Sequence, residues 1–392
     1  MTSNSNNNSP FAWLGLLKWS LAYSDGTRPT SEEFKPMSNE DMEFLEKVMK
    51  EGIIDEGERM KEILRSLTEG VESVMNASVV EGEEEKRKEI SEDDMFDLFQ
   101  ELRDIVEQID YARAFMAMGG ITFLLGCATT EGNIPKSIRK ASLSVLATMC
   151  QNNPPVQLNL LEVGHMPQLI QMFFDYSQTD ENADAVDDSV REKVVQTLSA
   201  SIRGHSMAEQ IFCQNEHGKT MLRIGLGMPH ASNPATADRP WAKPSVQLRK
   251  RSLFLLKALL TADEVTSERI MQYESFVSFV CTHEINPEWE EEAEIREMGL
   301  EMLTELIARH HVPVNVPAAG TIIAQHKNSI ASVGVKRIEE IKCLEESSEE
   351  REYAMVELEA WEQLMVTLSK IDDTLPNCSV CVGDDITSSV LD

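Results

Sequence analysis

Two short patterns in the chain have the residue types and spacing for thiol or metal chemistry. Cys378 and Cys381 are separated by two residues, the spacing of redox pairs and of half of many zinc sites. No second cysteine pair or nearby histidine completes a site, and His310 and His311 lack a third ligand at helical spacing. The sequence also has no phosphate-binding loop and no Gly-x-Ser-x-Gly nucleophile motif. We therefore expect no catalytic residue, no metal and no cofactor, with a thiol oxidoreductase using Cys378 and Cys381 as the enzymatic alternative.

A pattern that recurs four times organises most of the chain. A hydrophobic residue followed by an arginine begins four amphipathic segments, at spacings of 52, 58 and 47 residues: Arg139, Arg191, Arg249 and Arg296. The fourth residue after each arginine is Leu143, Val195, Leu253 or Leu300, and the seventh is Leu146, Leu198, Leu256 or Leu303. The tenth is Met149, Ser201, Leu259 or Leu306, so one repeat departs from the pattern. A recurring apolar stripe of helical period predicts stacked helical repeats without a β-sheet.

Each repeat is expected to contain one long helix and one or two shorter ones, an arrangement typical of armadillo repeats. In the first repeat, Pro154 must end the long helix Arg139–Gln151, and Val156–Val163 and Met166–Phe174 follow as shorter helices. We therefore predict an all-α, armadillo-like solenoid with a concave binding face. The four arginines of the pattern are expected to be structural and to pair with carboxylates of neighbouring repeats across the stack.

The same spacing locates candidate binding residues. If the fourth and seventh positions face the core, then the fifth, ninth and twelfth lie on an adjoining stripe that we expect on the concave face. Arg203 lies near the middle of this stripe, and arginine is favoured at the energetic centres of protein interfaces. Its alternative role is a surface cation that bonds the last carbonyls of its own helix. The stripe consists of Ser144, Thr148, Gln151, Gln196, Ala200, Arg203, Phe254 and Ala258.

Charge and cysteine content limit the kinds of partner. The chain has 36 basic and 67 acidic residues, for a net charge of −31. Nucleic-acid binding needs cations that replace counterions, so this balance argues against a nucleic-acid partner. The start of the chain lacks the basic region of a signal peptide, and no apolar run approaches the length of a membrane span. The scattered cysteines are typical of reduced thiols in a cytosolic or nuclear protein, and we expect a monomer that binds another protein.

Composition divides the rest of the chain into segments. Residues 1–30 have an Asn/Ser-rich start and a short segment with leucine and tryptophan, and residues 31–80 are a helical N-terminal region. A charged linker is expected at 81–94, repeats at 95–310 and an insertion at 311–335. C-terminal helices, Val335–Leu344 and Ser348–Lys370, occupy 336–370, and 371–392 is a loose acidic tail.

Several sequence blocks resemble those of one family. Leu16-Leu17-Lys18-Trp19-Ser20, followed by Asp25-Gly26-Thr27-Arg28-Pro29, is similar to the N-terminal signature of armadillo-type nucleotide-exchange factors for heat-shock-protein-70 (Hsp70) chaperones, the Fes1 and HspBP family. Three further blocks resemble the family's repeats: Glu107–Gly120, Ile138–Pro154 and Val190–Arg203. The resemblance spans about residues 11–310, and the helix near Arg337–Leu368 resembles that of plant-type members. The Pro-rich stretch Met228–Ser245 and the stretch His311–Val335 depart from the family.

The resemblance implies a co-chaperone that binds the ATPase domain of an Hsp70 chaperone through its concave face and promotes release of ADP and client. It implies that Ala112 lies where a bulky residue would block docking; the alternative is a packing alanine. Asn152 is a further candidate contact, with helix C-capping as its alternative role. Leu16, Leu17 and Trp19 would form a client-release segment, or instead a hydrophobic cap. A generic armadillo scaffold that binds another protein is the alternative function.

Overall fold

All regular secondary structure in the described part of the chain is helical. A computed structural model describes residues 55–76, 90–130, 132–176, 188–229, 244–310, 317–345 and 347–371, and every regular element in them is a helix. The chain divides into two compact units, Met1–Thr68 and Glu69–Asp392. Helix α3 (Glu56–Asn76) supplies the described residues of the first unit, and it buries Met60, Ile63 and Leu67. The all-α prediction is confirmed for these residues.

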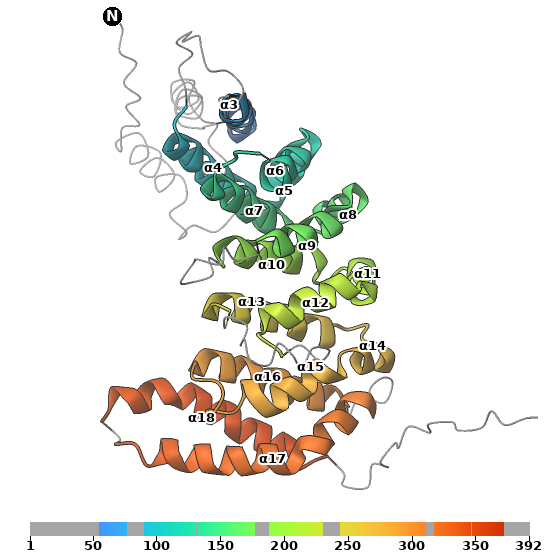
Figure 1. The fold of residues 1–392 in the computed structure, drawn as a ribbon, viewed down its shortest axis with the longest axis vertical. Helices are drawn as coiled ribbons and strands as arrows, with labels where there is room; N and C mark the ends of the chain where they lie inside the picture. Colours follow the sequence, from blue (N-terminus) through green and yellow to red (C-terminus); the bar gives the residue numbers. More distant parts are fainter. Residues whose placement is uncertain are drawn as a thin grey trace, which may run out of the picture. The chain divides into compact units, whose positions relative to one another are not determined.

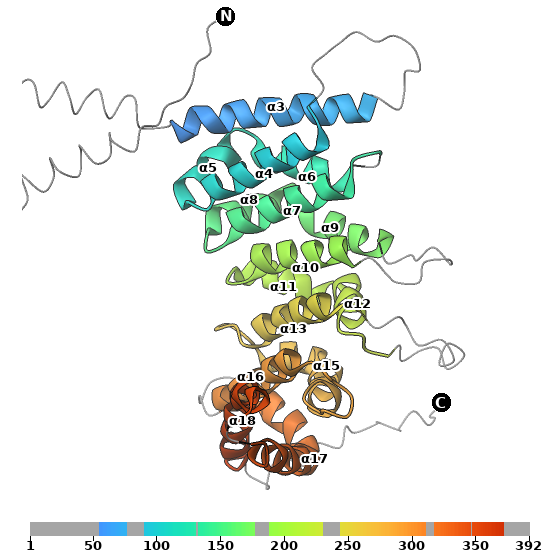
Figure 2. The same cartoon turned by 90° about the vertical axis from the view of Figure 1, so that its left-hand side faces the viewer.

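The second unit is built from successive groups of three helices. Each group begins with a long helix, and the long helices pack against one another in sequence order, so α7 lies between α4 and α10 (Figure 1). Figure 2 shows the same order from the side. The long helices are α4 (Glu92–Val106), α7 (Lys136–Cys150), α10 (Ser189–Ile202), α13 (Val246–Leu260) and α16 (Ala293–His310).

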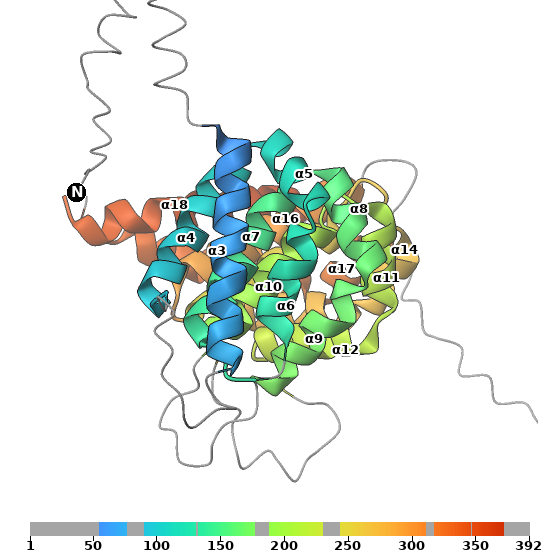
Figure 3. The same cartoon turned by 90° about the horizontal axis from the view of Figure 1, so that it is seen from above.

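Two shorter helices follow each of the first four long helices. Their bounds are α5 (Ile109–Ala117), α6 (Gly120–Thr129), α8 (Pro154–Val163), α9 (His165–Asp175), α11 (Ser206–Gln214), α12 (Glu216–Gly225), α14 (Ser267–Gln272) and α15 (Glu274–Phe279), with a π-helical turn, η2 (Val280–Glu284), after α15. Seen along the stack, α5, α8 and α11 gather on one side and α6, α9 and α12 on another (Figure 3). This long-plus-short grouping is the predicted armadillo-like arrangement.

No single described helix is long and apolar enough to span a membrane. The bent pair α5–α6 reaches the required length and composition only when its two helices are taken together.

The apolar stripe predicted from the arginine pattern forms the core between the long helices. All eight residues at the fourth and seventh positions are fully buried: Leu143, Leu146, Val195, Leu198, Leu253, Leu256, Leu300 and Leu303. Truncating one buried leucine in such a core costs about 2–5 kcal/mol, because the packed neighbours relax only partly into the cavity. The stripe therefore holds the successive groups together.

The repeat that departs from the stripe has a polar pair in its core. Ser201 on α10 is fully buried, and its hydroxyl lies 2.8 Å from Nε2 of His165. Nδ1 of the same ring lies 2.7 Å from the carbonyl oxygen of Leu160. Burial lowers the pKa of His165, so the neutral ring donates from Nδ1 to the carbonyl and accepts at Nε2 from the hydroxyl. A serine is tolerated in this core because the histidine satisfies it.

Local sequence signals set the ends of several helices. The hydroxyl of Ser91 accepts from the amide of Asp94 at 3.1 Å, and the Asp94 carboxylate accepts from the amide of Ser91 at 3.3 Å. This capping box starts α4, so residues 92–94 belong to a helix and not to the predicted linker. Pro154 occupies the first turn of α8, where a missing amide donor has no cost. Gly164, with a φ of 76°, joins α8 to α9 in a left-handed conformation that favours glycine.

The first two arginines of the pattern are buried, and the partners of Arg139 differ from the prediction. Within the described residues, Arg139 donates only to backbone carbonyls, at 2.5–3.2 Å: those of Ala128, Thr130, Gly132 and Ile134. It therefore holds the end of α6 and the following turn, where free carbonyls take the place of a carboxylate. Arg191 forms an ion pair with Asp188, the residue that precedes its own helix. The prediction is wrong for Arg139, because its nearest acceptors are the carbonyls at the end of α6 and in the turn before α7.

The other two arginines confirm the predicted pairing. Arg249 on α13 forms a buried ion pair with Glu290, which lies just before α16. Arg296 on α16 pairs with Glu357 on α18 (Glu349–Leu368), the last of the described helices. The first pair joins α13 to the segment before α16, and the second joins α16 to α18.

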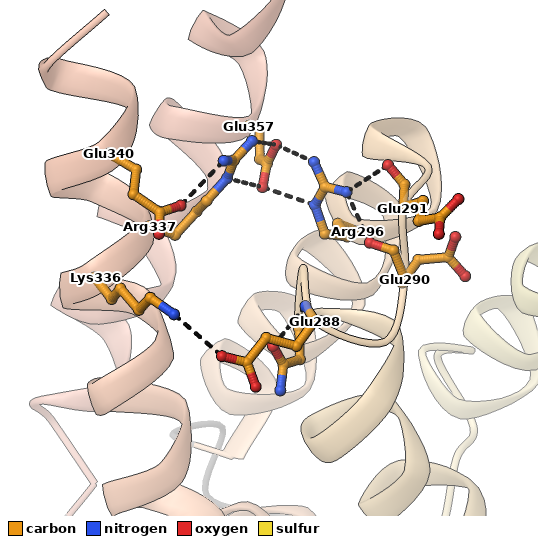
Figure 4. Close-up of polar contacts among 9 residues, drawn as sticks. Glu288, Glu290, Glu291, Arg296, Lys336, Arg337, Glu340 and Glu357 are labelled. Carbon is orange, nitrogen blue, oxygen red and sulfur yellow. Dashed lines mark hydrogen bonds and ion pairs between the residues drawn. The ribbon is translucent and has the colours of Figure 1, made fainter.

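Glu357 is the centre of an ion network among the last three helices (Figure 4). Its fully buried carboxylate accepts from Arg296 at 2.8 and 2.6 Å and from Arg337 at 3.0 and 3.1 Å. Burial alone would raise the pKa of Glu357, but hydrogen bonds and charges from the two arginines outweigh it and lower the pKa. The network ties α16 and α18 to α17 (Pro317–Lys342), which carries Arg337.

Helix α17 corrects the insertion predicted at 311–335. The helix begins at Pro317, so most of that stretch is helical, and Val335 lies inside the helix instead of at its start. Proline is favourable at a first helical position, and apolar residues then recur on one buried face: Ala319, Ile322, Ile323 and Ile330. A Cβ at Gly334 would lie 2.9 Å from the ring of Trp361 on α18. Gly334 lets α17 and α18 approach closely because it has no side chain. From the sequence alone, a glycine at this position is equally typical of a loop.

Other predicted segments lie outside the described residues. They are residues 1–54, the linker residues 81–89, residues 230–243 of the Pro-rich stretch, and the tail from residue 372. The client-release residues Leu16, Leu17 and Trp19 and the pair Cys378 and Cys381 fall in these segments.

Candidate protein-binding groove

A groove of about 390 Å³ lies on the face formed by the long helices. It runs from the end of α7 across α10 and α13 to α16, so three successive interfaces between groups contribute to it. Five of its residues were predicted from the spacing alone. The lining residues are Gln151, Gln196, Ser199, Ala200, Arg203, Lys250, Arg251, Phe254 and Met298.

Arg203 is the exposed cation at the centre of this groove. It follows the last turn of α10, and its guanidinium carbon lies 5.0 Å from the ring centroid of Phe254 on α13. Phe254 is itself 42% exposed, so the pair presents a cation and an aromatic ring on one surface. The alternative role, bonding the last carbonyls of its own helix, is not what the structure shows for Arg203.

Gln157 performs that capping role instead. This residue of α8 is 3% exposed, and its Nε2 donates to the carbonyls of Ala200 at 2.9 Å and Arg203 at 3.0 Å. The end of α10 is therefore held by the preceding group, which leaves the guanidinium of Arg203 free to stack on Phe254. Sequence reasoning missed Gln157; the available signal was a polar side chain on the apolar face of a short helix.

Five of the predicted residues do not line the groove: Ala112, Ser144, Thr148, Asn152 and Ala258. Ser144 is buried and donates to the carbonyl of Lys140 at 2.8 Å, and Thr148 is half-buried and donates to the carbonyl of Ser144 at 3.1 Å. Ala112 on α5 is 1% exposed, as expected of a packing alanine. Ser144 and Thr148 are covered because α7 packs between α4 and α10. The stripe beside the core face of α7 therefore faces a neighbouring helix instead of the groove.

Asn152 lies beside the groove in a conformation that ends a helix. Its φ is 51°, in the left-handed region that asparagine tolerates better than most residues, and it follows the C-cap residue Gln151. The next residue, Asn153, is buried, and its Oδ1 accepts from Nε of Arg113 at 3.2 Å. This geometry favours the capping role of Asn152 over a contact role.

Four of the five described cysteines are buried, and the fifth, Cys343, is exposed. Cys127, Cys150, Cys213 and Cys281 are buried and unpaired, and burial raises the pKa of Cys127 to about 12 and that of Cys281 to about 12. A thiol with so high a pKa is a poor nucleophile at neutral pH. Within the described ranges, no group of three His, Cys, Asp or Glu side chains is placed to hold a metal ion.

The fold is that of an armadillo-like repeat protein, and the groove is its candidate binding surface. The family described as "Nucleotide exchange factor Fes1" matches residues 14–115. A relative, "Hsp70 nucleotide exchange factor FES1" of Gibberella zeae, is 25% identical over 197 residues, which cover 50% of this chain and 79% of the relative. The matches confirm the resemblance to the Fes1 family of nucleotide-exchange factors.

Solved structures that match the chain include two armadillo proteins. A designed armadillo repeat protein has a TM-score of 0.46 at 11% identity, covering 78% of this chain and 98% of that one. The armadillo-repeats-only protein of Plasmodium falciparum has a TM-score of 0.41 at 14% identity, covering 70% of this chain and 100% of that one.

Proposed function

We propose that this protein is a nucleotide-exchange factor that binds the ATPase domain of an Hsp70 chaperone and accelerates release of ADP. The observation that carries the proposal is the match of residues 14–115 to the Fes1 family, and the FES1 relative supports it. The groove on the long-helix face supports it independently, because an exchange factor needs a binding surface and no catalytic group.

In the proposed mechanism, the groove binds one lobe of the ATPase domain and displaces the other by steric conflict. The complex would favour the nucleotide-free shape of the partner over its nucleotide-bound shape. By thermodynamic linkage, ADP and this protein then weaken each other's binding by the same factor. A hundredfold weakening needs about 2.7 kcal/mol of coupling, which a protein interface of ordinary size can supply. ATP would then enter and the client would leave.

Arg203 and Phe254 are the proposed anchors of the interface. Both are exposed, and the guanidinium already lies against the ring, so little side-chain entropy is lost when a partner carboxylate approaches. An arginine can meet a carboxylate with two parallel hydrogen bonds. Gln151, Gln196 and Ala200 would complete the surface with small and polar contacts.

The N-terminal segment is proposed to act on the client and not on the ATPase domain. Leu16, Leu17 and Trp19 would enter the substrate-binding site of the chaperone and help release its client. The protein is further proposed to act as a monomer in the cytosol, without a nucleic-acid or membrane partner.

The experiment that tests this function is a pair of calorimetric titrations of an Hsp70 ATPase domain with this protein. One uses the nucleotide-free domain and the other the domain saturated with ADP. The proposal predicts tighter binding to the nucleotide-free domain by about tenfold or more, since coupling in allosteric systems is commonly 1–3 kcal/mol. Equal affinity for the two states would overturn exchange activity and favour a scaffold role.

A further inference from the structure

Four successive long helices each present one basic residue to a common region of the molecule. The four are Arg103 on α4, Lys140 on α7, Lys193 on α10 and Arg251 on α13, and we call them the basic row. The helices that carry them pack in that order. The chain has a net charge of −31, so these four cations carry the minority charge of the molecule.

In the part of the chain that the structure describes, the basic row lacks carboxylates in ion-pair contact, although the charge of Glu192 acts on Lys193 and Arg251. Within the described residues, none of its four members forms an ion pair. The ammonium group of Lys193 donates to the side-chain oxygen of Gln196 at 3.4 Å, which is a neutral partner. Nε of the half-buried Arg251 is covered and has no hydrogen-bond partner. Buried donors without a partner are rare in folded proteins, and each one calls for an explanation.

Neighbouring lysines on the same helix show that carboxylate partners were available. Lys250 forms an ion pair with Glu294, and Lys257 forms one with Glu301 at 3.0 Å. Both acidic residues belong to α16, so the side of α13 that faces α16 is neutralised. On the opposite side, which faces α10, Arg251 forms no ion pair with a described carboxylate, although the charge of Glu192 on α10 acts on it.

The basic row carries an electrostatic cost. Burial lowers the pKa of Lys193, and three like charges lower it further: those of Arg251, Arg103 and Lys140. The carboxylate of Glu192 opposes this effect and does not reverse it. Like charges held close together destabilise the folded chain, so the arrangement does not serve stability.

The basic row continues into the groove. Arg251 lines the groove directly, and Gln196, the hydrogen-bond partner of Lys193, lines it as well. A partner that lies in the groove therefore also contacts Arg251, the end of the row on α13.

We propose that the basic row is a docking strip for a carboxylate-rich surface of the Hsp70 ATPase domain. The inference rests on the proposed function, since it assigns a second contact to the same partner. Guanidinium groups bind carboxylates with two parallel hydrogen bonds, which suits Arg103 and Arg251 at the two ends of the row. The rest of this acidic chain repels an acidic surface, so the row selects the orientation of the encounter and raises its rate.

The test neutralises the row and compares it with a matched change elsewhere. The variant Lys193→Gln/Arg251→Gln removes two positive charges from the row. The control Lys336→Gln/Lys342→Gln removes two positive charges from α17, where the side chains are 64% and 52% exposed. Association with an Hsp70 ATPase domain is measured by stopped flow at low and high salt, and both variants are melted thermally.

The row variant should associate at least about fivefold more slowly at low salt and show a weaker dependence on salt, because electrostatic steering is screened by ions. Its melting temperature should not fall, since like-charge repulsion is relieved. The control should match the unaltered protein in rate and salt dependence.

Three results would overturn the proposal. If the row variant associates at an unchanged rate with an unchanged salt dependence, the docking strip is refuted and the proposed function is unaffected. Faster association would mean that the row holds acidic residues of this chain, such as Glu81–Glu85, and not those of the partner. Absence of any association by the unaltered protein would remove the proposed function together with the docking strip.

Discussion

Substitution of Arg203 by alanine separates a binding role from a structural one. The guanidinium is exposed and lies 5.0 Å from the Phe254 ring, a geometry worth about 0.5–1 kcal/mol to the folded state. The hydrogen bond from Gln157 is kept, because its acceptor is the backbone carbonyl of residue 203. The melting temperature should therefore fall by less than about 4 °C.

Binding should respond much more strongly than stability. A central arginine that meets a carboxylate typically contributes about 2 kcal/mol or more to an interface, which is roughly a thirtyfold change in affinity. Calorimetric titration of an Hsp70 ATPase domain measures this loss. Combining Arg203→Ala with Phe254→Ala in a double-mutant cycle then shows how much of the loss depends on the ring beneath the guanidinium.

Arg223→Ala is the matched control for this experiment. Arg223 on α12 also stacks on an aromatic ring, with its guanidinium carbon 4.8 Å from the centroid of Phe276, but it does not line the groove. It should lose somewhat more stability than Arg203→Ala, because its guanidinium also donates to the hydroxyl of Ser275 at 2.6 Å, and it should keep full affinity. Unchanged affinity and melting in Arg203→Ala would make that residue a bystander, and lost affinity with a large fall in melting temperature would make it structural.

Further predictions concern the core, the ion network, the buried histidine and the N-terminal segment. Leu146→Ala and Leu256→Ala should each cost about 2–5 kcal/mol in chemical denaturation, and a loss under about 1 kcal/mol would contradict the repeat frame. Glu357→Gln should cost about 3–5 kcal/mol in the same assay, because two arginines would lose their buried counter-charge; near-neutral stability would refute the network's role. Because the pKa of His165 is lowered from 6.5, the unfolded chain binds its proton more readily. That contribution to stability should be complete above pH 6.5 and decrease as the pH falls below it, and His165→Gln should remove this component from the pH profile of unfolding. Deleting residues 1–30 should leave ATPase-domain binding nearly intact and slow client release; unfolding of the truncated chain would show that the segment is a cap.

The repeat architecture was predictable because it depends on local periodicity. Burial of a long helix requires apolar residues three and four positions apart, and that requirement is visible in the spacing of Leu143, Leu146, Leu253 and Leu256. The same spacing located Arg203 and Phe254 on one surface, because positions on a helix keep a fixed angular relation to its core face. The first part of helix α17 was missed because its proline and glycine residues are also typical of loops. In the structure, Pro317 starts the helix and Gly334 allows close contact with Trp361.

The partners of buried polar groups were not predictable from the sequence. Arg139 and Arg296 occupy equivalent positions and both donate to backbone carbonyls, yet only Arg296 also binds a carboxylate. The difference depends on which acceptor a neighbouring segment of the same chain brings close to each arginine. The spacing of residues in the sequence does not reveal which distant segments come together in the fold. Gln157 and the Ser201–His165 pair were missed for the same reason, since each joins residues more than 30 positions apart.

The central claim is that this protein accelerates ADP release from an Hsp70 chaperone. The most direct measurement is stopped-flow release of a fluorescent ADP analogue from the chaperone, chased with excess ATP, at increasing concentrations of this protein. The account predicts a release rate that rises and saturates with concentration, with Arg203→Ala needing a higher concentration to reach the same plateau. A release rate that does not change at any concentration, while the two proteins still bind, would contradict it.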